Sequence, residues 1–367
     1  MMQIGPNTRL RVSPFFDATI EAGATAFSPY NKMLMPVSFG DPSAEYERLI
    51  NAVSQWDVSV QRQIEISGPD AARLAQILSV RDLSKCAIGQ GKYVPMCDHA
   101  GNLINDPVVL KLAEDKFWFS IADNNIELWA QSIAHERQLN VEICEPDVSP
   151  LAVQGPKAED VVAKLFGEWV RDLKFFWFAD VLAGDIPVKL VRAGFSKQGG
   201  FELFLMDGSR GKELWNLVHE AGISLGIGPG YPNPVERIES GLLSYGGDTD
   251  AKTNPFEVRL EKYVNLTLDD EVIGIRALRK IKEEGVKRHQ LGVKILGQEA
   301  HEGHAIWYDI EKDGVKVGNM TNGGWSPRLN ASIGFALVSV SCQPGDVVTV
   351  MKHGQSLEGT LCELPFI

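Results

Sequence analysis

The chain has 367 residues, with 36 lysines and arginines against 48 aspartates and glutamates, so its formal net charge is −12. That sign disfavours a protein that tracks the phosphate backbone of nucleic acids. No window approaches the ~20 apolar residues of a membrane span, and the N-terminus lacks the pattern of a signal peptide, so we expect a soluble cytoplasmic protein. Five scattered cysteines without a C-x-x-C pair favour neither a disulfide framework nor a zinc site.

Helical and strand patterns alternate through the first part of the chain. Apolar residues at helical spacing predict a helix over 45–55, and alternating residues predict a strand over 56–66. Further elements are a helix over 71–78, two strands within 91–113 joined at 98–102, a strand over 117–122 and a helix over 125–138. This first cycle is typical of an α+β domain.

A second cycle of the same kind begins near residue 148. It comprises a strand to 154, a helix over 158–166, strands around 175–178, 188–192 and 201–205, and a helix over 209–221. Gly-Pro turns at Gly68 and Gly155 precede the helices predicted over 71–78 and 158–166. We therefore expect two related α+β halves, and the weak self-similarity leaves open whether they arose by duplication.

The pattern changes after a lysine-rich helix predicted over 276–284. Short β segments separated by turn residues follow, at 291–295, 305–309, 315–320, 333–340 and 347–350. They predict a small β-barrel or sandwich. The boundary near Gly285 divides the chain into residues 1–284 and 285–367.

Two blocks, residues 192–204 and 236–248, combine glycines with carboxylates and an aromatic residue. Such a composition suits backbone that approaches a flat polar ligand while a carboxylate accepts its N–H groups. Glu202 lies in the first block, on a predicted strand, and is either such an acceptor or a solvent-exposed residue at the strand edge. No glycine-rich phosphate motif stands at a strand-to-helix junction, so phosphate binding is disfavoured.

Other charged residues allow structural and functional interpretations. Asp106, after Asn105 at the exit of a predicted hairpin, is either a satisfied turn carboxylate or a site residue. Arg237 and Glu239 do not share a helix face, and structural ion pairs to other elements are the simpler interpretation. His301 and His304 are the only close histidine pair and have no matching acid nearby, so no metal site is expected.

Several motifs resemble the glycine-cleavage T-protein (aminomethyltransferase) family in order and spacing. They lie at 56–59, 66–71, 101–106, 151–156, 194–202, 237–241 and 318–327. Within that family, residues 30–34, 196–200, 229–230, 236–240, 243–246 and 254–257 look most like the dimethylsulfoniopropionate demethylases. The resemblance implies a three-domain cloverleaf of two related folate-binding α+β domains and a C-terminal barrel or jelly roll. It also implies transfer of a methyl group to tetrahydrofolate.

The resemblance also implies a site. By position, Asp106 matches the catalytic acid near the folate nitrogens, and Asn105 replaces the first acid of the family's pair. The expected cofactor-binding residues are Tyr93, Asn105, Asp106, Phe119, Glu202 and Arg237, and the expected methyl-donor residues are Tyr30, Phe195 and Trp325. Glu202 would hold the pterin edge, and the backbone of Phe119 would face the ring.

Three departures bear on the methyl donor. Phe195 stands where the demethylases have tryptophan, Lys32 where they have histidine, and Asn233 where T-proteins have arginine. A sulfonium leaves as a neutral sulfide and needs mainly alignment in a dry site, so losing one carboxylate costs a demethylase less than it would cost a T-protein.

These observations predict a tetrahydrofolate-dependent methyltransferase that takes a small-molecule donor, dimethylsulfoniopropionate or another sulfonium or betaine. We expect no nucleic-acid or membrane partner, and a homodimer stays open. The alternative is an aminomethyltransferase, which would dock a carrier protein and is weakened by Asn105 and Asn233. The alternative from another class is a non-catalytic folate-binding module, whose K-G-C-Y-x-G-Q-E signature is absent.

Overall fold

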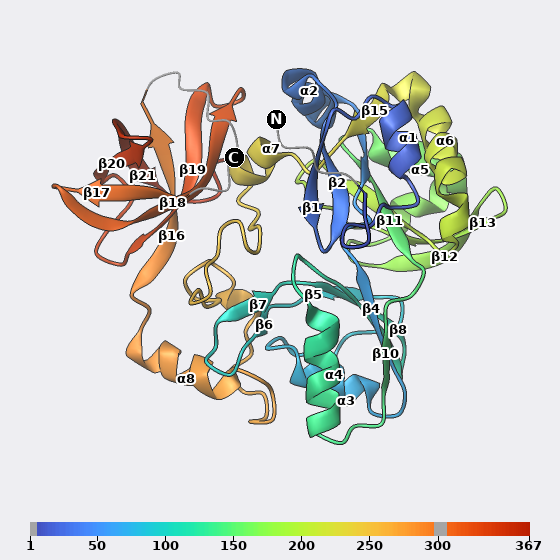
Figure 1. The fold of residues 1–367 in the computed structure, drawn as a ribbon, viewed down its shortest axis with the longest axis horizontal. Helices are drawn as coiled ribbons and strands as arrows, with labels where there is room; N and C mark the ends of the chain where they lie inside the picture. The colour runs from blue at the N-terminus through green and yellow to red at the C-terminus, as the bar shows by residue number, and fades with distance from the viewer. Residues whose placement is uncertain (1–5, 297–306) are drawn as a thin grey trace. The chain divides into compact units, whose positions relative to one another are not determined.

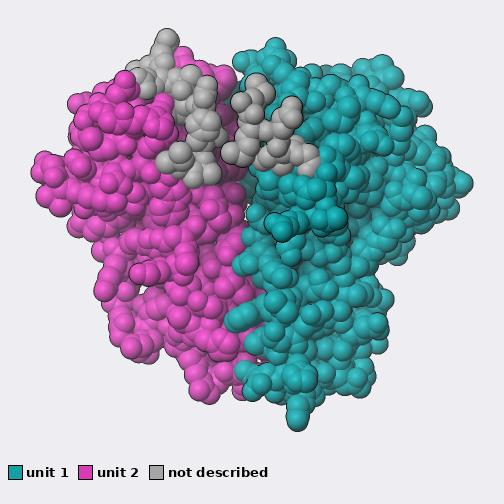
Figure 2. All heavy atoms as spheres, viewed as in Figure 1, with its two compact units in different colours: residues 1–75, 83–93, 107–233 teal, residues 76–82, 94–106, 234–367 magenta. Residues whose placement is uncertain are grey.

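The computed structural model describes residues 6–296 and 307–367 of the chain (Figure 1). The chain forms two compact units, each assembled from separate segments (Figure 2). The first comprises residues 1–75, 83–93 and 107–233, and the second comprises residues 76–82, 94–106 and 234–367. The predicted division of the chain near Gly285 stays a prediction.

A six-stranded sheet forms the centre of the first unit. Its order is β12 (Phe178–Ala183), β13 (Ile186–Val191), β14 (Gly200–Leu205), β11 (Ser149–Gln154), β3 (Val53–Asp57) and β15 (Ile227–Gly230). Only β15 and β3 run parallel. Neighbours in this sheet are distant in sequence, so side chains from three chain segments share each face.

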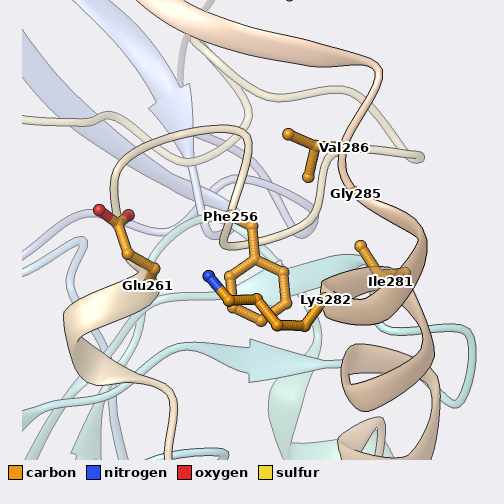
Figure 3. A pocket seen from close by; sticks show the side chains of 6 residues that line it. All are labelled: Phe256, Glu261, Ile281, Lys282, Gly285 and Val286. Atoms are coloured by element: carbon orange, nitrogen blue, oxygen red, sulfur yellow. The ribbon is translucent and has the colours of Figure 1, made fainter.

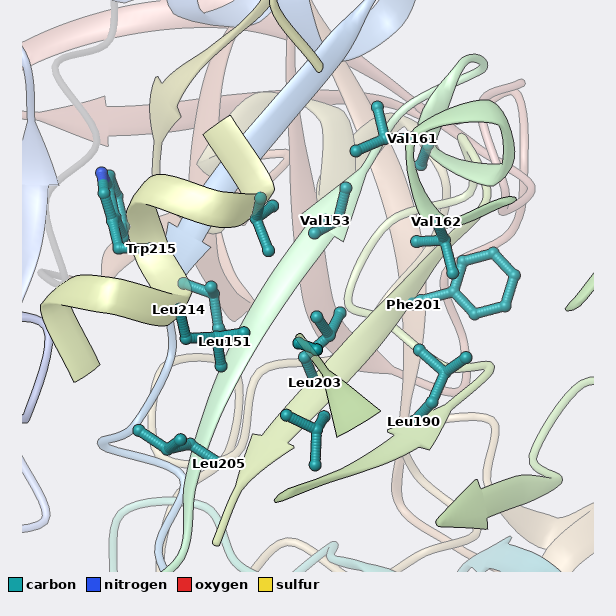
Figure 4. Close-up of a cluster of buried hydrophobic side chains, with 14 of the residues drawn as sticks. Leu151, Val153, Val161, Val162, Leu190, Phe201, Leu203, Leu205, Leu214 and Trp215 are labelled. Atoms are coloured by element: carbon teal, nitrogen blue, oxygen red, sulfur yellow. The ribbon is translucent and has the colours of Figure 1, made fainter. Parts of the chain in front are cut away.

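Helices cover one face of this sheet. They are α1 (Phe16–Glu21), α5 (Ala158–Phe166) and α6 (Gly211–Gly222), and their apolar side chains form a core with the strands (Figure 4). Leu151, Phe201 and Leu203 point from the strands into this core and are at most 1% exposed. Removing so many apolar side chains from water supplies the main stabilising free energy of the unit.

A five-stranded antiparallel sheet packs on the opposite face of the six-stranded sheet. Its order is β10 (Glu142–Cys144), β4 (Gln63–Ser67), β9 (Lys116–Ser120), β8 (Val108–Ala113) and β5 (Gly91–Tyr93). The rings of Trp118 and Phe204 stack across the two sheets with 6.4 Å between centroids, in one buried cluster with Leu110 and Val191. Helix α4 (Ile126–Glu136) follows β9, and a hairpin of β1 (Ala26–Tyr30) and β2 (Met33–Ser38) precedes helix α2 (Pro42–Asn51).

The second unit contains a closed six-stranded barrel. Its order is β16 (Arg288–Ile295), β19 (Ala331–Ser339), β18 (Val315–Ser326), β17 (Tyr308–Lys312), β20 (Val347–Lys352) and β21 (Gln355–Cys362). Helix α7 (Pro234–Glu239) packs on it through Ile238, which clusters with Ile333 and Phe335. The unit also holds the β6 (Met96–Cys97) and β7 (Leu103–Asn105) hairpin, the turn η4 (Glu261–Tyr263) and helix α8 (Ile275–Glu284).

The structure confirms the α+β class and the C-terminal barrel, and it corrects some element boundaries. The helix predicted over 45–55 ends at Asn51, because Val53 and Trp56 belong to the buried strand β3. The strand predicted over 56–66 is wrong at 58–62, which lie between β3 and β4. The strand near 175–178 starts only at Phe178, and β21 was missed. Residues 305 and 306 of one predicted strand, with His301 and His304, lie outside the described residues.

Candidate functional site

Glu202 stands at the centre of an otherwise largely apolar row that crosses all six strands of the large sheet. The row is Phe178, Val191, Glu202, Ala152, Trp56 and Gly230. Because strand side chains alternate between faces, Glu202 points away from the helix-covered core that takes Phe201 and Leu203. Of the two interpretations of Glu202, the solvent-exposed residue at the strand edge is therefore wrong, since Glu202 is only 9% exposed.

The Glu202 carboxyl has no hydrogen-bond partner among the described residues. Burial without compensating donors raises its pKa to about 7. Asp57, which is more deeply buried at the end of β3, two strands away in the sheet, accepts hydrogen bonds from the Ser13 hydroxyl and the Ser59 N–H. A buried carboxyl without donors is costly to the fold, and a ligand with N–H groups would supply the donors that the protein does not.

Gln154 occupies the next position along this face and holds the loop that precedes β14. It is fully buried, its Nε2 donates to the Ala193 carbonyl at 3.1 Å, and its Oε1 accepts from the Ser196 hydroxyl at 2.8 Å. A Cβ at Gly194 or Gly200 would lie 2.0 or 2.3 Å from this Nε2. The glycines of the first block therefore allow the loop to close on Gln154, and the half-buried Phe195 lies in this loop.

Trp56 continues the row on the other side of Glu202. Its Nε1 donates to the Ser54 hydroxyl at 2.6 Å, and its ring packs with Leu49, Val58 and Ala152. A Cβ at Gly230 would lie 2.2 Å from the Ser54 Oγ, so only glycine lets β15 approach β3 here. Trp56 and Gln154 lie in the family motifs at 56–59 and 151–156, but the sequence predicted no role for them. They share a face with Glu202 only because of the order of the strands in the sheet.

Tyr93 and Phe119 lie in the five-stranded sheet. Tyr93 ends the edge strand β5, is half-buried and pairs with Val108. Phe119 is fully buried in the interior strand β9, and its neighbours in the ladder are Ile64 and Val109. The roles of Tyr93 and Phe119 at a pterin stay predictions.

Four predicted site residues belong to the second unit. Asn105 ends β7 and is fully buried, and its Oδ1 accepts from the backbone N–H of the half-buried Asp106 at 3.1 Å. The Asn105 amide thus fixes the backbone that presents Asp106. Trp325 lies half-buried in β18, where it pairs with Ser332.

Arg237, the fourth, forms a buried ion pair. Its Nη1 lies 2.7 Å from Asp248 Oδ2, and its guanidinium stacks on Phe335 at 5.6 Å. Asp248 is fully buried and also accepts from the Thr321 hydroxyl and the Asn322 amide, each at 3.0 Å. Glu239 similarly accepts from Arg328 and the Ser326 hydroxyl. The interpretation of Arg237 and Glu239 as structural ion pairs is confirmed, and folate binding by Arg237 stays a prediction.

The second unit also has a pocket of about 310 Å³ (Figure 3). Its lining residues are Phe256, Glu261, Ile281, Lys282, Gly285 and Val286. The Lys282 ammonium lies over the Phe256 ring, 5.6 Å from its centroid. None of the predicted site residues lines this pocket. Within the described ranges, no cluster of three or more histidines, cysteines or acids could hold a metal ion, and no helix is long and apolar enough to cross a membrane.

Comparisons with known proteins define the class. Residues 15–268 match the GCVT N-terminal domain, and residues 288–367 match the glycine cleavage T-protein C-terminal barrel domain. The structure superposes on the aminomethyltransferase T of Bartonella henselae with a TM-score of 0.85 at 21% identity, covering 97% of this chain and 98% of the other. The chain belongs to the glycine-cleavage T-protein family, whose members use tetrahydrofolate as the one-carbon acceptor. The predicted family, fold and cofactor are thereby confirmed.

Individual relatives fall into two groups. The chain is 40% identical over 341 residues to the dimethylsulfoniopropionate demethylase DmdA of Ruegeria pomeroyi, with 93% of each chain covered. It is 32% identical over 339 residues to an aminomethyltransferase of Caldanaerobacter subterraneus, covering 90% of this chain and 89% of the relative. Both groups span nearly the whole chain.

Proposed function

We propose that the protein transfers a methyl group from dimethylsulfoniopropionate to tetrahydrofolate, giving methylmercaptopropionate and 5-methyltetrahydrofolate. The observation that carries the proposal is the 40% identity to a demethylase of this substrate over 93% of both chains. The aminomethyltransferase of Caldanaerobacter subterraneus reaches 32% over a similar length.

Glu202 is the residue that we assign to the pterin. Tetrahydrofolate supplies the nucleophilic N5 that takes up the methyl group, and its pyrimidine edge carries adjacent N–H donors. The buried Glu202 carboxyl, without donors among the described residues, can accept these N–H groups at its two oxygens. Hydrogen bonds to the charged form would also lower the pKa of Glu202 on binding.

The methyl transfer itself needs little acid–base catalysis by the protein. The N5 lone pair forms the new bond to the methyl carbon, the electron pair of the S–CH₃ bond leaves with sulfur, and N5 loses a proton. We assign Asp106 to orient or accept that proton, with Asn105 holding its backbone at 3.1 Å. A neutral amide at Asn105 suits this reaction, since no amine leaving group needs an acid.

The cationic methyl donor calls for aromatic side chains. We assign Tyr30, Phe195 and Trp325 to its pocket, where a sulfonium over an aromatic face gains about 0.5–2 kcal/mol. Phenylalanine at 195 is a weaker cation binder than tryptophan, so another sulfonium or a betaine is the second candidate donor.

Aminomethyl transfer is the second candidate function, favoured by full-length relatives at 30–32% identity. It is disfavoured by Asn105, which replaces an acid that an amine leaving group would use.

The experiment is incubation with tetrahydrofolate and a panel of methylated sulfonium and ammonium compounds, with 5-methyltetrahydrofolate as the readout. We expect methylfolate with dimethylsulfoniopropionate and little with glycine betaine. Glycine-dependent turnover with a lipoylated carrier protein would favour the aminomethyltransferase. Folate binding without product from any donor would favour the non-catalytic module.

A further inference from the structure

The turn between β1 and β2 has an unusual backbone. Asn31 and Lys32 form it, with Tyr30 paired to Met33, and their φ angles are +47° and +59°. Both residues are thus left-handed, as a two-residue hairpin turn of type I′ requires. Glycine is the favoured second residue of such a turn, because the Cβ of an L residue is crowded in the left-handed conformation. Lys32 therefore occupies its position against a local preference.

Asn31 clamps this turn to the rest of the first unit. Its side chain is buried, its Nδ2 donates to the carbonyls of Val60 at 2.9 Å and Ala122 at 3.2 Å, and its Oδ1 accepts from the Asn124 N–H at 3.0 Å. Its own N–H donates to Asp123 Oδ1 at 2.8 Å. Strained backbone persists only where surrounding contacts determine it, and these contacts hold Lys32 in place.

The clamp connects the turn to the chain segments that follow β3 and β9. Val60 follows Trp56 on the same segment, and four residues span at most ~13 Å. Val58, between them, packs with Trp56 and Ala152, which lie in the Glu202 row. The second anchor, at Ala122, follows the end of β9 at Ser120. The turn is thus fixed to the segments that leave both sheets of the first unit.

The Lys32 side chain is exposed on this rigid turn. Its ammonium group forms no ion pair or hydrogen bond with any residue in the described part of the chain. Its carbonyl, by contrast, accepts from the Arg11 N–H at 2.9 Å. A rigid backbone therefore carries a compact cation with three donors two residues from Tyr30, on a chain whose net charge is −12.

We propose that Lys32 binds the carboxylate of the methyl donor, so that the β1–β2 turn selects onium compounds that also carry an anionic group. The inference rests on the proposed methyl transfer and deepens it. The donor then has two recognised ends. Aromatic side chains take the onium group, and the Lys32 ammonium takes the carboxylate by a charge-assisted hydrogen bond.

The test compares two donors that share the sulfonium and differ in the carboxylate, namely dimethylsulfoniopropionate and trimethylsulfonium. Lys32→Ala should raise the KM for dimethylsulfoniopropionate about tenfold and leave kcat nearly unchanged, because a binding contact away from the reacting carbon is removed. Lys32→Arg should stay within about threefold of the wild type in KM, since the charge is kept. The KM for trimethylsulfonium should not change in either variant. Lys294→Ala, which removes an exposed lysine from the barrel, is the matched control.

Lys32→Gly separates binding from folding. Glycine suits the φ of +59°, so this variant should unfold at an equal or higher temperature while its KM for dimethylsulfoniopropionate rises by the same tenfold. An equal rise in KM for both donors, or no rise for either, would overturn the inference.

Failure of the proposed reaction gives a different result. If the wild type makes no methylfolate from any donor, calorimetric titration with dimethylsulfoniopropionate still compares the wild type with Lys32→Ala. Weaker binding by the variant supports the carboxylate contact, and equal affinity contradicts it.

Discussion

Two buried charged groups, one in each unit, have opposite surroundings. In the second unit, Asp248 lies at 2.7 Å from Arg237 and accepts further hydrogen bonds from Thr321 and Asn322. In the first unit, Glu202 is buried with no partner among the described residues. The comparison separates a carboxylate that the fold pairs with its own donors from a carboxyl to which the described residues give none, and which we propose as the pterin acceptor.

The largest effect is expected from breaking the satisfied pair. Asp248→Ala leaves the Arg237 guanidinium buried without its counter-charge and should lower the free energy of unfolding by about 3–5 kcal/mol. Denaturant titration measures this loss. The double variant Arg237→Met with Asp248→Leu should recover most of it, because no charge is then left alone. A small loss in the single variant would mean that the pair is not structural.

The next largest effect concerns the free energy of unfolding, which Glu202 should make dependent on pH. Its pKa is about 7 in the folded state against an ordinary value of 4.5, so the folded protein binds more protons between these values. The stabilisation from this group is therefore complete below pH 4.5 and is lost as pH rises through about 7. It amounts to about 3 kcal/mol at 1.4 kcal/mol per pKa unit.

Glu202→Gln removes this titration and keeps the shape of the side chain. The difference in unfolding free energy between wild type and variant should shift in favour of the variant from pH 5 to pH 8. Parallel pH profiles for the two proteins would show that Glu202 does not titrate abnormally.

A smaller effect is expected on ligand affinity. Glu202→Gln should weaken tetrahydrofolate binding about 10–100-fold, because a charge-assisted hydrogen bond is worth ~1.5–3 kcal/mol. Isothermal titration calorimetry measures the affinity, and the stability of the variant above pH 7 controls for misfolding. Asp250→Asn, which alters a half-exposed ion pair with Arg288, is a matched control that should leave folate affinity unchanged. Unchanged affinity in Glu202→Gln would remove this residue from the pterin site.

The smallest effect is expected beside Glu202. Ser196→Ala removes the 2.8 Å hydrogen bond to Gln154 Oε1 and should cost about 1 kcal/mol of stability. If the loop over Gln154 positions Phe195, the same variant should raise the KM for the methyl donor about threefold without changing folate affinity. A larger change in folate affinity than in donor KM would place the loop at the pterin instead.

The class of fold was predictable from the sequence, whereas the role of Glu202 at the pterin stays a prediction and its structural surroundings were not predicted. The motif at 194–202 was sufficient to assign Glu202 by resemblance. Trp56 and Gln154 were missed as its neighbours because they come from β3 and β11, and the order of strands in a sheet is not visible in local periodicity. No role was predicted for Asp248 in the second glycine block. Its ion pair with Arg237 forms only because the chain turns after α7, and this turn was not predicted.

The predicted boundaries of helices and strands were wrong where burial in the folded protein outweighed the local hydrophobic pattern. The residues Val53 to Gln55 continue the helical spacing of α2, yet they form the fully buried start of β3. The strained turn at Asn31 and Lys32 was also beyond prediction, since its stability depends on carbonyls at Val60 and Ala122 that lie far along the chain.

The most direct measurement of the central claim is the pKa of the Glu202 carboxyl with and without tetrahydrofolate, by isotope-edited infrared or carbon NMR spectroscopy against Glu202→Gln. A group that is buried without donors and then accepts the pterin N–H groups should titrate near 7 in the free protein and well below that when folate is bound. A Glu202 pKa that stays the same in both states would contradict the assignment of this residue as the pterin acceptor.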